Sequence, residues 1–114
     1  MLEDATSRGV KFNIDHCDDG GSTALHKAAA NAEIQCMQIL KSYGATLTRN
    51  KNGNTPVHWA AQNGKLEALQ FLINNYDNVD VLEKNDFGIS ALSGKYFFSL
   101  ILFFIQFLIE FSFL

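Results

Sequence analysis

The sequence has few cysteines and few basic residues, which secreted and nucleic-acid-binding proteins respectively rely on. Its two cysteines, Cys17 and Cys36, are too few for a disulfide framework, and no charged start with an apolar core and cleavage site marks a secretory signal. Nine Lys and Arg among 114 residues form no basic stripe. Nucleic acid is therefore not an expected partner, because phosphate binding needs clustered positive charge. A reducing, cytosol-facing environment is expected.

Charge is also nearly absent from the last part of the chain. All nine Lys and Arg, and eleven of the twelve acidic residues, precede Tyr96. Seven of the ten phenylalanines lie between Phe97 and Phe113. The chain therefore divides into a mildly acidic polar part and an apolar tail, residues 96–114.

The polar part contains an internal repeat. Thr23–Ala29 (TALHKAA) overlies Thr55–Ala61 (TPVHWAA) at an offset of 32 residues. A third start appears at Gly88–Leu92, 35 residues beyond the second. Residues 8–13 echo residues 43–48, so the chain also opens inside a unit. A period of this length is the signature of a repeat architecture.

Each unit is predicted to form two helices joined by turns. Thr23 and Thr55 stand where an N-cap hydroxyl accepts from free backbone N–H groups, and Pro56 follows at the first helical position. Gly64 ends the first helix of its unit, and Gly44 closes the second helix of the unit before.

The second helix of each unit carries apolar residues at helical spacing. These residues are Ile34, Met37 and Leu40 in one unit and Leu66, Leu69, Leu72 and Ile73 in the next. Cys36 aligns with Ala68, so we expect it to pack as a small hydrophobic residue.

This pattern resembles the ankyrin repeat, whose units carry T-P-L-H-x-A-A and a G-A-D-V-N-like link. The resemblance covers roughly residues 9–93 and implies an all-α fold, a short helix-turn-helix solenoid, here followed by a single hydrophobic C-terminal helix. We expect a partial unit and hairpin at 1–20, repeats at 21–53 and 54–87, the start of a truncated third repeat at 88–95, and the tail at 96–114.

The chain departs from the ankyrin pattern in several places, including insertions near Ile14–Gly20 and Val81–Phe87. Ala32 replaces the usual glycine of its unit, and Tyr76-Asp77 replaces the Gly-Ala link after the second repeat. The third unit stops after Leu92, four residues into its first helix.

No motif for catalysis, a cofactor or a metal is present. The chain has no C-x2-C or H-x3-H pair for zinc, and Gly20-Gly21 is not followed by the G-K-[ST] of a phosphate-binding loop. The resemblance instead assigns a structural role to His26 and His58, each in a hydrogen-bond network with the threonine of its motif, Thr23 or Thr55. We therefore expect no enzyme activity.

The resemblance implies that the chain binds another protein through a concave surface. The hairpin tips and turns would supply Asp19, Ser22, Lys51, Asn52, Asn54, Asp86 and Phe87. The first helices would supply Lys27, Ala30, Asn31, Trp59, Gln62 and Asn63. Trp59 is the candidate energetic anchor, because interface hot spots favour Trp, Tyr and Arg. The alternative is that its ring packs on the neighbouring helix. The identity of the protein partner is not indicated, and no small-molecule substrate is expected.

The tail has three interpretations. As a helix, its last 18 residues would extend about 27 Å, close to the thickness of a bilayer core, with Lys95 and Tyr96 at its entry and Glu110 near the far interface. It would then anchor a small adaptor whose repeats face the cytosol. Alternatively, it folds back and covers the bare end of the second repeat.

The third interpretation is that the tail is translated intron. Ser93–Tyr96 falls where the third repeat should continue, and one codon choice for Gly-Lys-Tyr forms a splice donor. The chain would then be a truncated or alternatively spliced cytoplasmic fragment of a larger ankyrin-containing protein. The sequence leaves these alternatives open.

Overall fold

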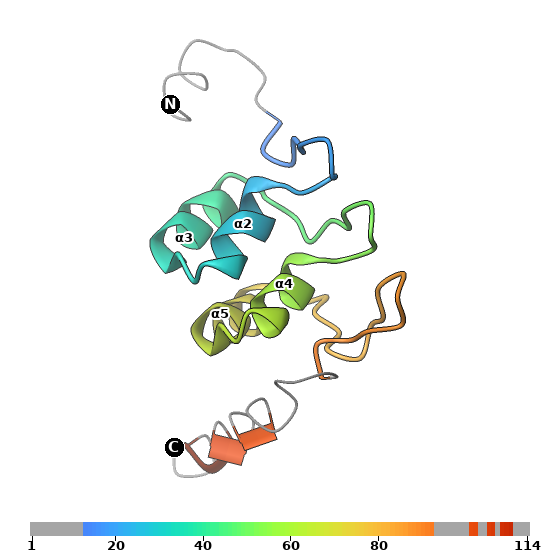
Figure 1. Ribbon diagram of the computed structural model, residues 1–114. Coiled ribbons are helices and arrows are strands. Elements are labelled where there is room, and N and C mark those ends of the chain that lie inside the picture. The colour runs from blue at the N-terminus through green and yellow to red at the C-terminus, as the bar shows by residue number, and fades with distance from the viewer. Residues whose placement is uncertain (1–12, 93–100, 103–104, 107, 111–114) are drawn as a thin grey trace.

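The helices form two stacked pairs. The computed structural model describes residues 13–92, 101–102, 105–106 and 108–110. Figure 1 shows one pair above the other, with the connecting loops projecting on the same side. Within residues 13–92 the helices of these pairs are α2 (Ala24–Ala30), α3 (Ile34–Ser42), α4 (Pro56–Gln62) and α5 (Leu66–Asn75). Regular structure in the described residues is entirely helical, which confirms the predicted all-α class.

The first helix of each pair begins at a threonine, as predicted. The Thr23 Oγ1 accepts the backbone N–H of His26 at 3.3 Å, and the Thr23 backbone N–H donates to the His26 Nδ1 at 3.2 Å. Thr55 and His58 repeat this capping box at 3.4 and 3.1 Å, with Pro56 at the first helical position. A side-chain N-cap of this kind contributes about 1 kcal/mol.

Each histidine also reaches the loop of the following unit. The Nε2 of His26 lies 2.8 Å from the backbone oxygen of Asn54, and the Nε2 of His58 lies 2.8 Å from that of Glu83. Because Nδ1 accepts the threonine N–H, the proton is on Nε2, which donates to the carbonyl. Burial is the main cause that lowers the pKa of His26 below its usual 6.5.

The core lies between the two pairs and follows the predicted apolar spacing. Leu25, Met37, Leu69 and Leu72 are completely buried. The main contact between the units is that of α2 with α4. Buried alanines on both helices, Ala29 and Ala60 among them, allow this close approach because their side chains are small.

The turn between the helices of the first pair contains a strained residue. Ala32 has φ +55°, whereas Gly64 has φ +67° at the same place in the next unit. The left-handed region suits glycine, and a Cβ there costs about 1 kcal/mol. The predicted closing residue of α3, Gly44, has φ +89°.

Tyr76, which departs from the ankyrin link, ties the two units together. Its hydroxyl donates to the backbone oxygen of Ala45 at 2.7 Å. Lys41 places its ammonium 4.9 Å from the centre of the Tyr76 ring. Burial, and to a lesser extent Asp15, raises the pKa of Tyr76 to about 12, so the hydroxyl remains a donor.

The structure corrects two predictions about the helices. Cys36 is exposed, although its counterpart Ala68 is completely buried. The reason is that the unit carrying Ala68 packs against α2 and α3, whereas no described helix covers the side of α3 that bears Cys36. Ala91 and Leu92 form a turn instead of the expected helix start, although Ala91 is buried in the core.

Seven tail residues are described, and all seven are helical. Four of their side chains are apolar and exposed, at 66%, 48%, 61% and 46%: Leu102, Ile105, Leu108 and Ile109. The remaining residues of the predicted C-terminal helix lie outside the described residues. Within the part of the chain that is described, no helix combines the length and the apolar character needed to cross a membrane.

We predict that Ala32→Gly stabilises the fold by up to about 1 kcal/mol, since it relieves the left-handed strain at φ +55°. The matched control is Ala30→Gly at the end of α2, which should destabilise by about 0.5–1 kcal/mol because that position is helical. Urea unfolding followed by Trp59 fluorescence measures both. Equal destabilisation by the two substitutions would contradict this account of the turn.

We also predict that stability falls as the pH drops through about 6.5. The folded pKa of His26 is lowered, so the unfolded state binds the additional proton below that pH. The loss of stability levels off below the pKa that His26 has in the folded state. The urea midpoint between pH 7.5 and 5 should fall in the parent chain and in His16→Gln, whose side chain is exposed, but much less in His26→Gln. An unchanged slope in His26→Gln would exclude this histidine as the source.

Candidate protein-binding surface

Three loop tips share one hydrogen-bonding pattern, here called the tip clamp. A side-chain oxygen accepts the backbone N–H groups two and four residues further on, at 2.9 to 3.0 Å. The accepting residues are Asp18, Asn50 and Asn85. Three residues after each clamp stands a glycine with φ between 76° and 79°. The tips therefore have one shape at equivalent positions.

Backbone hydrogen bonds join successive tips. The N–H of Lys51 donates to the oxygen of Gly20 at 2.9 Å, and the N–H of Asp86 donates to the oxygen of Asn52 at 3.0 Å. The backbones approach so closely that a Cβ on Gly53 would lie 2.8 Å from the Asp86 nitrogen. The tips are thus held in register as one row.

The row presents a short set of exposed side chains. They are Asp19, Lys51, Asn52, Asp86 and Phe87. Charges of opposite sign alternate along the row, from the first tip to the third. The ring of Phe87 is 70% exposed. Because its backbone N–H is held by the clamp, the backbone that carries this apolar ring has a defined position.

The first helices add exposed polar side chains from Lys27, Asn31, Gln62 and Asn63. The Lys27 ammonium lies 3.2 Å from an Asp18 carboxylate oxygen, which links α2 to the first tip. The backbone N–H of Ser22, followed by Lys27, lowers the pKa of the Asp18 carboxyl below its usual 3.8. This ion pair is exposed and therefore weak, so it orients the side chains more than it stabilises the fold.

Trp59 lies between the two units. Its ring meets the His26 ring edge to face, with 5.3 Å between centroids and 76° between planes. The side chain is half-buried. It therefore packs on the neighbouring unit, as the alternative interpretation held, and retains an accessible part.

Two of the predicted contact residues are buried. Ser22 is 6% exposed and Asn54 is 7% exposed. The side-chain oxygen of Asn54 accepts from the amides of Asn85 at 2.8 Å and Gln62 at 3.3 Å. We therefore leave Ser22 and Asn54 out of the surface. Asn54 joins the second and third tips, and the Ser22 hydroxyl accepts from the Asn50 amide at 3.4 Å.

The tip clamps were missed at the sequence level, although the sequence carries a signal for them. An Asp or Asn stands three residues before the glycine of every unit start, as in Asp18-x-x-Gly21 and Asn50-x-x-Gly53.

Among the described residues, no three His, Cys, Asp or Glu side chains are grouped as metal ligands. The arrangement offers contacts to another macromolecule.

Comparison with known proteins gives two matches. A curated relative from rice (Oryza sativa subsp. japonica), named "Probable E3 ubiquitin-protein ligase XBOS33", is 44% identical over 50 residues. This match covers 38% of the present chain and 10% of the rice protein, so the chain spans about a tenth of that relative's length. A family model described as ankyrin repeats (3 copies) matches residues 3–85. This match covers most of the chain and agrees with the stacked helix pairs and the loops held in register. The chain therefore belongs to the ankyrin-repeat family.

Proposed function

We propose that the chain is a non-catalytic module that binds another protein. Its binding face consists of Asp19, Lys51, Asn52, Asp86 and Phe87 on the tips and Lys27, Asn31, Trp59, Gln62 and Asn63 on α2 and α4. The observation that carries this proposal is the row of clamped tips. Because the tip backbones are already ordered, binding through them costs less entropy than binding through flexible loops. Membership of the ankyrin-repeat family supports the same class of function.

The binding face has the chemistry of a protein interface. It combines an exposed aromatic ring on Phe87, part of a Trp59 ring, and amide and charged groups around them. Its charges are of both signs, which favours a partner of mixed charge. The rice relative is named a probable ligase, but the likeness covers only a repeat region. Ligase chemistry is therefore not proposed for this chain.

We predict that Lys51→Glu combined with Phe87→Ser weakens partner binding at least tenfold. Aromatic anchors and charge complementarity carry much of the affinity at such interfaces. Both side chains are exposed, so the urea midpoint should hardly change. The control pair, Glu67→Gln with Asn74→Ser, changes exposed residues of α5 outside the binding face.

Proximity labelling in cells provides the measurement, with the full chain and both variants fused to a biotin ligase. Proteins labelled by the parent and control chains but lost with the tip variant support the proposal. An identical set with all three chains would place the interaction elsewhere.

A second candidate function concerns the tail, residues 96–114, which would hold the binding module at a membrane. It is favoured by the apolar sequence of the tail and by the exposed apolar side chains of its described residues, such as Leu102 and Leu108. A membrane interior accepts such side chains, whereas water does not. The competing proposal is a truncated fragment with no independent function, prone to aggregate through the same side chains.

We predict that the full chain stays with membranes after an alkaline carbonate wash and dissolves in mild detergent, whereas residues 1–94 alone do not stay. A membrane anchor in the tail requires both that the full chain resists the wash and that the truncated chain does not. A full chain that pellets in detergent as well would exclude an anchor and favour the fragment. A truncated chain that stays with membranes would show that the repeats, not the tail, carry the attachment.

A further inference from the structure

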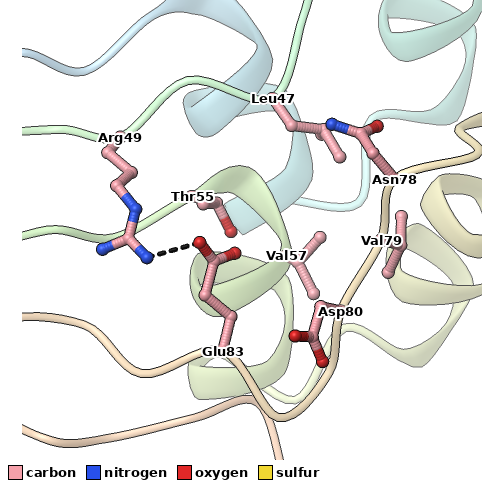
Figure 2. A pocket seen from close by; sticks show the side chains of 8 residues that line it. All are labelled: Leu47, Arg49, Thr55, Val57, Asn78, Val79, Asp80 and Glu83. Carbon is pink, nitrogen blue, oxygen red and sulfur yellow. Dashed lines mark hydrogen bonds and ion pairs between the residues drawn. The ribbon is translucent and has the colours of Figure 1, made fainter.

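A cavity of about 250 Å³ lies beside the start of α4, between residues 47–49 and residues 78–83. Figure 2 shows the side chains that line it. Leu47 and Val79, both partly exposed, form its apolar side with the buried Val57 behind them, and Arg49, Asp80 and Glu83 contribute charges. None of these residues belongs to the binding face. The cavity is therefore a separate feature of the two-unit stack.

The positive charge in this cavity is already satisfied. In Figure 2 the Arg49 guanidinium forms an ion pair with the Glu83 carboxylate. Arg49 also donates to the backbone oxygens of Gly53 and Lys84, both at 3.4 Å. Three of its five N–H groups are thus engaged, and the paired Glu83 carboxylate would repel a second anion. A phosphate or carboxylate ligand is therefore disfavoured.

The negative charge of Asp80 is not balanced in the same way. Its Oδ1 accepts the backbone N–H of Leu82 at 2.9 Å. Its other carboxylate oxygen has no hydrogen-bond partner among the described residues. With Arg49 and Glu83 paired, Asp80 leaves the cavity with a net negative charge next to an aliphatic wall.

We propose that this cavity binds the side chain of a lysine from a partner protein. The methylenes of lysine would lie along Leu47 and Val79, and the ammonium would reach the exposed Asp80 carboxylate. The volume is below the roughly 300–1,000 Å³ typical of small-molecule sites, so it fits one long side chain. A charge-assisted hydrogen bond to a carboxylate supplies the specificity.

The test is a titration with Nα-acetyl-lysine methylamide, followed by NMR on the isotope-labelled full chain in non-ionic detergent. The matched probe is Nα-acetyl-norleucine methylamide, which keeps the aliphatic chain and lacks the ammonium. The lysine probe should cause saturable shifts centred on Val57 and Val79, weakened by added salt. The norleucine probe should bind at least about tenfold more weakly.

Two variants separate the cavity from general attraction to an acidic chain. Asp80→Asn keeps an oxygen for the Leu82 N–H but removes the charge, so it should weaken lysine binding about tenfold. Asp77→Asn, at an exposed residue outside the cavity, should change it less than twofold.

Four results would overturn the proposal, and the first three concern where and how the probes bind. They are equal binding of the two probes, shifts spread over the whole surface, and an equal loss in the two variants. No saturable shift at all would show a solvent-filled cavity only. Because the probe needs no partner protein, a failure here is distinct from a failure of the proposed binding face.

Discussion

The stack depends on the hydrogen bond from each motif histidine to the loop that follows its unit. His26 and His58 each use one ring nitrogen to complete their own helix cap and the other to hold the next backbone, at 2.8 Å. One side chain thus sets both the start of a helix and the position of its neighbour. An unsatisfied buried ring nitrogen would cost about 1–3 kcal/mol, so the register of the units is strongly determined.

The parts of the fold that depend on local pattern follow from the sequence. Threonine caps, helix spacing and the glycine after α3 are read from neighbouring residues. The burial of Ser22 and Asn54 and the exposure of Cys36 could not be predicted in this way, because they depend on which unit lies next in space. The repeat alignment equates Cys36 with Ala68. Ala68 is buried by the preceding unit, whereas the unit that carries Cys36 is the first in the described stack and has no such neighbour there.

The candidate surface was predictable in outline. Its tips and first helices are identified by alignment with the family pattern, whereas the clamps that order the tips are visible only when Asp18, Asn50 and Asn85 are compared with the glycines they precede. The cavity at Asp80 was not predictable, since residues more than 20 positions apart line it. A chain that spans a tenth of its rice relative shares a scaffold with it. In the proposed function, the scaffold supports binding and the exposed side chains select the partner.

The most direct test of this account is the tautomer of the two histidines, measured by nitrogen NMR of the ring at neutral pH. The account predicts that both rings carry their proton on Nε2, with a coupling across the hydrogen bond to the carbonyls of Asn54 and Glu83. A proton on Nδ1 in either ring would contradict it, because that ring could neither accept the threonine N–H nor donate to the next loop.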